Sequence, residues 1–286
     1  MSQLFDGEFL NKIQRLALNA RFSSGGVSAG NRKSRSKGSS VEFSDYREYA
    51  PGDDFRRIDW NAFGRFEKLF IKLFMEEREA PVSIFVDVSK SMDWGEPNKS
   101  FASRRLAAAL AYISLINFDR VSVACVDDDV RQVCRNVRGK SLFGRITEIL
   151  ESVQYTGESH IAKAVENSRI LAGRGISVVI SDFFTRGSIA ELTRFLDYNR
   201  QTSYICHILS PQELSPDVGG SVRLVDSETG KFIDITVTPS LLKSYGKALD
   251  DFTGLTEQAC IKRGAYYFRF SSDTAAEMMV KEVAGH

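Results

Sequence analysis

The sequence predicts an α/β protein in which a small N-terminal module with β-structure precedes a doubly wound, mostly parallel sheet. From Pro81 onward, short apolar runs alternate with longer amphipathic segments, the pattern of a parallel sheet covered by helices on both faces. Before Pro81, strand-like runs flank a stretch rich in turn residues. The 286 residues, 43% of them hydrophobic, suffice for one large domain, or for one domain with a smaller appendage.

The chain starts with an amphipathic helix that is followed by a basic loop. Phe5, Phe9, Ile13 and Leu16 recur at the spacing that places side chains on one face of a helix. Residues 21–40 are rich in Gly and Ser and carry five cations and no acid. This composition predicts a solvated loop.

The next stretch is predicted to form a small β-rich module or hairpin. Strand-like runs at 41–49 and 68–74 lie on either side of the turn-rich sequence PGDDFRRIDW. Trp60 at the end of that sequence is expected to anchor the packing of the module. We therefore group residues 1–80 as an N-terminal helix, a basic loop and a small β-rich module.

Residues 81–286 are predicted to form the main domain, in which strands and helices alternate. Its strands are expected at 82–86, 121–126, 177–180, 204–209 and 266–270. Its helices are expected at about 100–117, 142–152, 160–171, 188–198 and 239–263. Two strand-like runs within 221–238 predict a hairpin insertion there.

Charge and cysteine usage exclude several classes of protein. Lys plus Arg total 38 against 37 for Asp plus Glu, so the chain lacks the overall basic field that predicts nucleic-acid binding. The four cysteines form no C-x-x-C pair, and we expect them to be reduced core residues. The longest apolar run, 106–118, is too short to span a bilayer, and the N-terminus does not resemble a signal peptide. We therefore expect a cytoplasmic protein without a transmembrane segment.

Polar residues follow the first predicted strand of the main domain in the sequence SIFVDVSKSM. Ligands of open parallel sheets bind at the carboxyl edge of the strands, because the loops diverge there. Asp87 follows the strand, and Ser89 and Ser91 come at alternate positions in the outgoing loop. This spacing can aim one carboxylate and two hydroxyls at a common centre. Oxygen ligands of this kind suit a hard cation such as Mg²⁺, with Mn²⁺ or Ca²⁺ as substitutes.

Two further segments can contribute to the same site. Ser159 stands at a predicted helix start after Gly157, where its hydroxyl can cap the helix, reach a metal, or do both. The strand at 176–180 ends in Ser181 and Asp182. Asp182 offers a second carboxylate, and Ser181 could compete with it.

The sequence Asp87-Val88-Ser89-Lys90-Ser91 resembles the Asp-x-Ser-x-Ser core of the metal-ion-dependent adhesion site of von Willebrand factor A domains. The resemblance implies a von Willebrand factor A-like, Rossmann-like fold. It also implies that Ser159 stands where that site usually has Thr, and Asp182 where it has its second Asp. Ser keeps the hydroxyl of Thr and lacks its methyl group.

The flanking sequences resemble the bacterial family called domain of unknown function 58. They are EFSDYREYAPGDDFRRIDWNAFGR, KLFIKLFMEERE, ISDFF, HILSPQEL and VDSETG. The resemblance extends from about Val41 to Phe270, and Pro-Gly-Asp-Asp with Ile-Asp-Trp is its most specific part. Members of that family often accompany MoxR-type AAA+ ATPases, which implies a chaperone or assembly role.

These observations predict a protein that binds its partners through a metal ion and is not an enzyme. Incomplete coordination by Asp87, Ser89, Ser91 and Ser159, with Asp182 acting directly or through water, leaves a position for an acidic residue of a client protein. The expected role is that of an adaptor or co-chaperone of a MoxR-type ATPase.

Two alternatives remain at this point. In the first, the protein is a magnesium-dependent phosphatase whose Asp87 attacks phosphorus, as in haloacid dehalogenase-like enzymes. Such enzymes generally have a second Asp two residues later as acid and base, and Ser89 cannot supply that proton near neutral pH. In the second, the protein is a structural scaffold without a metal.

Overall fold

The computed structural model describes residues 4–16, 41–76, 81–117, 119–171, 173–227 and 230–285. The chain divides into two compact units. One contains residues 1–30 and 80–286, and the other contains residues 31–79. The predicted basic loop at 21–40 lies outside the described residues.

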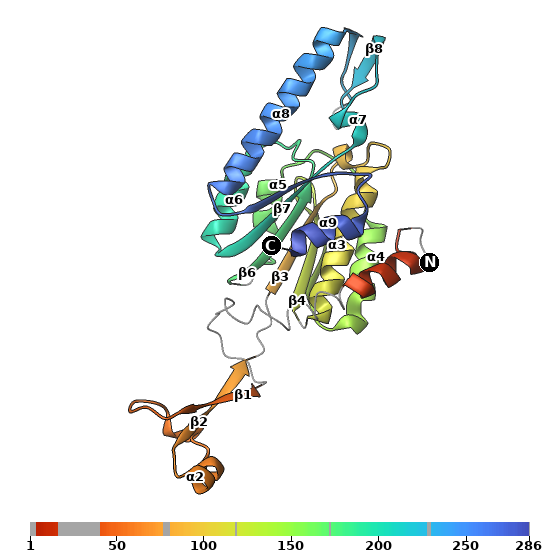
Figure 1. Ribbon diagram of the computed structural model, residues 1–286. Coiled ribbons are helices and arrows are strands. Elements are labelled where there is room, and N and C mark those ends of the chain that lie inside the picture. Colours follow the sequence, from red (N-terminus) through yellow and green to blue (C-terminus); the bar gives the residue numbers. More distant parts are fainter. Residues whose placement is uncertain are drawn as a thin grey trace. The chain divides into compact units, whose positions relative to one another are not determined.

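A six-stranded sheet forms the centre of the main unit (Figure 1). Its strands are β3 (Pro81–Asp87), β4 (Arg120–Val126), β5 (Val130–Val137), β6 (Gly175–Ser181), β7 (Gln201–Leu209) and β10 (Tyr266–Ser271). They lie in the order β10-β7-β6-β3-β4-β5. All neighbours are parallel except β4 and β5. The prediction of an α/β fold with a mostly parallel sheet is confirmed.

The edge strand β5 was not expected from the sequence. The run VRQVCRNV mixes apolar residues with cationic and amide side chains, and several of its positions are exposed or half-buried. The inner strands β3, β4 and β6 are apolar because both of their faces are covered. An edge strand can tolerate polar side chains, so its apolar pattern is weak.

Helices cover both faces of this sheet. On one face, helix 7–16, α3 (Lys99–Ile116), α4 (Phe143–Ser152) and α9 (Ala276–Ala284) share a core cluster with alternate residues of β3. On the other face, α5 (Ile161–Ser168), α6 (Ile189–Tyr198) and α8 (Pro239–Ile261) share a second cluster. The short helix α9, which is buried against α3, was not expected from the sequence. Among the described residues, no helix is both long and apolar enough to cross a membrane.

The first helix belongs to the main unit and not to the β-rich module. Leu4, Phe5, Phe9 and Ile13 are buried in the same core cluster as α3 and α9. Arg105 of α3 also donates to the carbonyl oxygen of Leu4 at 2.9 Å. The predicted boundary at residue 80 therefore differs from the division that the contacts give. The amphipathic pattern indicates that a helix has a buried face, but not which part of the chain buries it.

The smaller unit is built on an antiparallel pair, β1 (Val41–Glu48) and β2 (Phe70–Glu76), with a short 3₁₀ turn (Phe55–Arg57) and α2 (Trp60–Phe66) between them. Asp59 caps α2, accepting from the backbone N–H groups of Asn61 and Ala62. Trp60 is 64% exposed, so the expectation that it anchors the packing is wrong. It meets Phe63 of its own helix edge to face, with ring centroids 6.3 Å apart.

A hairpin follows β7 and the short helix α7 (Pro211–Leu214). Its strands, β8 (Gly220–Val225) and β9 (Phe232–Val237), pair antiparallel with each other and lie outside the central sheet. Figure 1 shows this hairpin at the end of α8 that is farther from the central sheet. The sequence predicts a hairpin near 221–238, in agreement with these bounds.

Candidate metal site

The order of the strands places a crevice between the carboxyl ends of β3 and β6. From β3 the chain proceeds outward to β4 and β5, and it then returns to the other side of β3 to form β6, β7 and β10. The connections that follow β3 and β6 therefore run in opposite directions, which makes this point the topological switch of the sheet. Asp87 is the last residue of β3, and Ser181 is the last residue of β6.

Alternation along the strands turns these two residues to the same face. Phe85 of β3 and Val179 of β6 belong to the core cluster under α5 and α6. Because side chains repeat every two residues in a strand, Asp87 and Ser181 follow Phe85 and Val179 to that face. Ser181 Oγ donates to Asp87 Oδ2 at 2.6 Å.

Ser159 reaches the same carboxylate oxygen from a third part of the chain. It lies two residues before α5, and its Oγ donates to Asp87 Oδ2 at 3.0 Å. Its side chain therefore turns toward Asp87. The N-cap residue of α5 is His160, whose own side chain does not cap the helix, and Thr185 Oγ1 accepts from the first backbone N–H of the helix, that of Ile161, at 3.1 Å.

The loop after β3 supplies the two serines of the motif. The backbone N–H of Ser89 donates to Asp87 Oδ1 at 2.9 Å, and the hydroxyls of Ser89 and Ser91 lie 3.1 Å apart. Two backbone bonds fix this loop to the segment before Ser159, from Thr156 N to Val88 O and from Lys90 N to Gly157 O, each 3.1 Å long.

The structure thus brings Asp87, Ser89, Ser91 and Ser159 into one hydrogen-bonded network, which we call the Asp87 network. Ser181 completes it as a fifth member. The sequence presented Ser181 as a competitor of Asp182. The signal for its role was its position two residues after Val179, on the face that Asp87 shares.

Asp182 lies beside the Asp87 network and is bonded elsewhere. Its Oδ2 accepts from Lys99 Nζ at 2.7 Å, and its Oδ1 accepts from the backbone N–H of Phe184 at 3.1 Å. Lys99 was not among the residues expected at the site. It is separated from Asp182 by 83 positions, and no pattern in one sequence indicates such a pairing.

The electrostatics of the site favour an additional cation. Burial and, to a smaller extent, the charge of nearby Asp182 raise the pKa of Asp87 to about 6, although the hydrogen bonds from Ser181 and Ser89 lower it. Lys99 also contacts Glu213. Counting these four groups alone, the ionised carboxylates of Asp87, Asp182 and Glu213 exceed the one ammonium group of Lys99 by two negative charges. Uncompensated charge is unfavourable in a buried site, and a divalent ion carries the charge that would balance it.

The residues present therefore fit a hard divalent ion. Asp87, Ser89, Ser91 and Ser159 would hold it, with Asp182 acting directly or through water. Elsewhere in the described parts of the chain, as here, no three or more His, Cys, Asp and Glu side chains gather in a way that could hold a metal. Any ion bound at the Asp87 network would depend on hydroxyl ligands.

Access to the network is narrow. Asp87, Ser89, Ser159 and Asp182 are each 0% exposed, and Ser91 is 9% exposed. A group from outside would therefore approach on the side of Ser91.

The surrounding loops carry exposed aromatic and cationic side chains, which we call the rim. Trp94 and Phe184 are 46% and 38% exposed. Lys90 and Arg186 are paired with Asp93 and Glu158, at 2.8 and 2.6 Å. Arg186 is joined to the site by its backbone N–H, which donates to Ser159 O at 2.8 Å.

Comparisons with known proteins give a family and several relatives. The family model described as "Protein of unknown function DUF58" matches residues 45–251. Uncharacterized protein Rv1480 of Mycobacterium tuberculosis and uncharacterized protein Mb1516 of Mycobacterium bovis are each 25% identical over 250 residues, which cover 85% of this chain and 78% of theirs.

Similar solved structures include BatB, a conserved hypothetical protein from Bacteroides thetaiotaomicron, with 15% identity and a TM-score of 0.45. An aerotolerance-related membrane protein from Bacteroides fragilis has 16% identity and a TM-score of 0.47. The two matches each cover 72% of this chain, and 97% and 98% of the other chain.

Proposed function

The chain belongs to the DUF58 family, and from this premise we propose that it is a metal-dependent protein-binding module with a von Willebrand factor A-like fold. The observation that carries the proposal is the convergence of three chain segments on the Asp87 carboxylate at the switch point of the sheet. A buried Asp with hydroxyls on several sides is the oxygen-rich environment that Mg²⁺ prefers.

The proposed mechanism is capture of an acidic side chain by the bound ion. Mg²⁺ requires six oxygen ligands at octahedral positions and usually keeps several waters. Asp87 and the hydroxyls of Ser89, Ser91 and Ser159 supply fewer oxygens than that, so a carboxylate of a partner can replace a water on the side of Ser91. Binding is then lost when a chelator removes the ion.

The rim has the side chains that such a partner would meet. Exposed aromatic residues and arginine are enriched among the residues that contribute most to protein–protein binding, and Trp94, Phe184 and Arg186 are of these types. Lys90 and Arg186 are each paired with a carboxylate, so they offer hydrogen-bond donors to an acidic segment without adding net positive charge.

We further propose that the partners are a MoxR-type AAA+ ATPase and a client protein that carries the acidic residue. This part of the proposal rests on family resemblance. The protein would act as an adaptor or co-chaperone that presents the client to the ATPase. We propose the cytoplasm as its location, and the four free, buried cysteines support a reducing compartment.

A phosphatase mechanism through Asp87 is disfavoured by the contacts of its carboxylate. Asp87 Oδ2 already accepts two hydroxyl hydrogen bonds, and Ser89 occupies the position where such enzymes have an acid and base. An assay with Mg²⁺ and a generic phosphate ester separates the two mechanisms. Sustained turnover that is lost in Asp87→Ala would replace the binding proposal with an enzyme.

A pull-down from native lysate tests the binding proposal. Wild-type protein should retain its partners in Mg²⁺ and release them in a chelator, and Asp87→Ala should retain none in either buffer. Asp127→Ala is the matched control, because Asp127 is also a buried carboxylate, directly after the neighbouring strand β4, but is paired with Arg131. Equal capture by wild type and Asp87→Ala, with or without chelator, would refute the proposal.

A further inference from the structure

Lys99 is a buried cation at a position that helix electrostatics disfavours. It is the first residue of α3 and is 0% exposed. The positive end of a helix dipole lies at that terminus, where a cationic side chain is unfavourable. Burial of an ammonium group is also unfavourable unless carboxylates compensate for the lost hydration. The position of Lys99 therefore depends on its partners.

Two carboxylates hold the ammonium group. Lys99 Nζ lies 2.7 Å from Asp182 Oδ2 and 2.5 Å from Glu213 Oε1. Burial by itself lowers the pKa of Lys99, but the charges of Asp182 and Glu213 outweigh it, so the pKa lies above its ordinary value. The Phe184 ring, with its centroid 5.5 Å from Nζ, adds a cation–π contact. Lys99 is thus charged and fixed in place.

The two carboxylates differ in their other contacts. Glu213 belongs to α7, and its Oε2 accepts from the backbone N–H and the hydroxyl of Ser210 at 2.7 and 3.1 Å. Tyr245 of α8 donates to the backbone carbonyl of Glu213 at 2.8 Å. Glu213 is therefore held by its own helix and by α8. Asp182, in contrast, lies beside the Asp87 network, and its charge raises the pKa of Asp87.

We propose that Lys99 is a resident cation that competes with the divalent ion for Asp182 and thereby sets the metal affinity of the site. This inference rests on the proposed function, because it takes an ion to bind beside Asp87. When no ion is bound, Lys99 neutralises Asp182, so the protein folds without metal. When an ion binds, the ammonium group repels it, because Lys99 Nζ is within hydrogen-bond distance of a candidate ligand. The site then fills only at higher concentrations of metal.

Replacement of Lys99 by Met tests the competition, because Met keeps much of the side-chain volume and removes the charge. We expect Lys99→Met to bind Mg²⁺ about tenfold more tightly or better in calorimetric titration, since one repelling charge is removed at short range. Without metal its unfolding temperature should fall below that of wild type. Saturating Mg²⁺ should raise that temperature by more than it raises the wild-type value.

Lys12→Met is the matched control. Lys12 is also a lysine of the main unit that pairs with carboxylates, but it is half-exposed and its partners, Glu8 and Glu277, are not candidate ligands. We expect Lys12→Met to change the Mg²⁺ affinity by less than about threefold, because solvent screens an exposed charge. If Lys99→Met does not fold without metal, Lys99→Met combined with Glu213→Gln removes one of the two unpaired carboxylates. It should still bind Mg²⁺ more tightly than wild type, because the ammonium group beside Asp182 is gone, but by less than Lys99→Met alone, because the lost charge of Glu213 also attracted the ion.

The possible results separate this inference from the proposed function. If wild type binds Mg²⁺ through Asp87 but Lys99→Met binds it within twofold of wild type, the competition is refuted and the proposed function stands. The same follows if Lys99→Met loses equal stability with and without Mg²⁺, because Lys99 is then a structural ion pair alone. If wild type binds no Mg²⁺ through Asp87, both proposals fail.

Discussion

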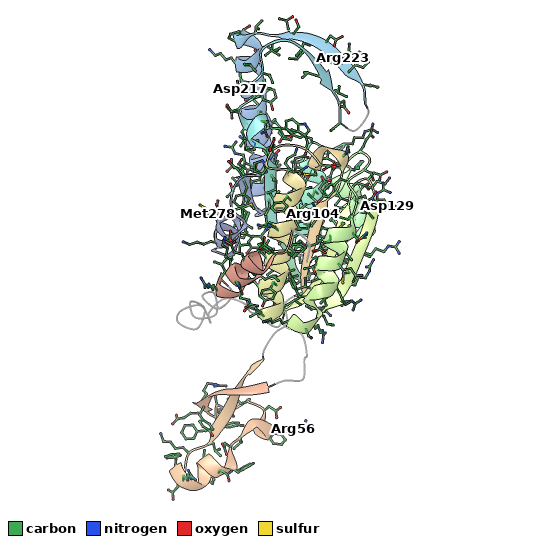
Figure 2. All side chains as sticks on the ribbon, turned by 90° about the vertical axis from the view of Figure 1, so that its right-hand side faces the viewer. Arg56, Arg104, Asp129, Asp217, Arg223 and Met278 are labelled. Carbon is green, nitrogen blue, oxygen red and sulfur yellow. The ribbon has the colours of Figure 1, made fainter. Side chains whose placement is uncertain are left out.

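Two ion pairs of this protein have the same length and opposite surroundings. Lys99 Nζ lies 2.7 Å from Asp182, and Arg223 Nε lies 2.7 Å from Asp234. The side chains of the first pair are 1% and 0% exposed, and those of the second are 59% and 62% exposed. Figure 2 shows Arg223 on the ribbon of the hairpin. The distance between two charges therefore does not indicate what the pair contributes; burial does.

The same contrast holds for the strands of the two regions. In the central sheet, Val82, Ile84 and Phe85 of β3 are at most 3% exposed, because helices cover both faces of the sheet. In the hairpin, Leu224 and Ile233 are partners across the two strands and are 48% and 60% exposed. Similar apolar side chains thus form a core in one region and a solvent-exposed face in the other. The local sequence predicts a strand in both cases. Whether its side chains are buried depends on whether helices cover the faces of the sheet.

The largest expected effect comes from breaking the buried pair. In the presence of a chelator, Lys99→Met should lower the free energy of unfolding by about 3–5 kcal/mol, because it leaves buried carboxylates without a counter-charge. Urea denaturation measures this loss. A loss below about 1 kcal/mol would show that the buried pair behaves like an exposed one.

A smaller effect is expected from His207, which is buried in β7 beside the site. Burial lowers its pKa from 6.5 to about 4, while Asp182 opposes this shift and Lys99 and Arg269 add to it. As the pH falls, His207 gains its proton in the unfolded chain before it does so in the folded protein. The contribution of neutral His207 to the free energy of unfolding is therefore complete above pH 6.5 and is lost as the pH falls toward 4.

The corresponding free energy is roughly 3 kcal/mol, and it appears as a slope of stability against pH in urea denaturation. The His207→Gln variant should lose that slope. The hydroxyl of Tyr267, which lies 2.7 Å from Nδ1 of His207, can form a hydrogen bond with the Gln side chain instead. An unchanged slope in the variant would assign the acid sensitivity to other groups.

A third comparison separates the two serines that donate to Asp87 Oδ2. Ser181→Ala should cost about 1–3 kcal/mol in the free energy of unfolding, because a buried carboxylate loses a donor. It should keep its Mg²⁺ affinity, since Ser181 is not among the candidate ligands. Ser159→Ala should lose stability by a similar amount and bind Mg²⁺ more weakly. If titrations give the two variants the same affinity, the assignment of Ser159 as the ligand is wrong.

The smallest effect is expected at the exposed pair. Arg223→Ala should leave the free energy of unfolding almost unchanged, because solvent already hydrates both charges. Thermal unfolding at low and high salt measures this change, and added salt should reduce it further. A loss comparable to that of Lys99→Met would remove the distinction between the two regions.

Much of the fold could be predicted because its signals are local. The parallel strands are apolar runs, α3 contains the longest apolar run, and α8 has a periodic buried face; both helices start at recognisable N-cap residues, Asn98 and Thr238. The structure differs from the prediction where a segment's role depends on the segments that it packs against. The edge strand β5 has a mixed pattern, α9 is short, and the first helix packs on elements that start only at Pro81.

The site could be predicted where neighbouring residues carry it. Asp87, Ser89 and Ser91 lie within five positions, and the carboxyl-edge rule placed Asp182 near them. Ser159 was proposed from its position at a predicted helix start and from the resemblance to the adhesion site. The rule did not reveal that Lys99 would hold Asp182, nor that Glu213 would share Lys99 from 114 positions away. Charge balance in a buried site is a property of the folded chain, so sequence spacing does not contain it.

Titration of Mg²⁺ into three proteins tests most directly whether Asp87 gathers the oxygens of a metal site. The proteins are wild type, Asp87→Asn and the control Asp127→Asn, each checked for an intact fold by circular dichroism. We expect one saturable Mg²⁺ site in wild type and in Asp127→Asn, and none in Asp87→Asn. Equal binding by wild type and Asp87→Asn, or no binding by wild type, would contradict the account.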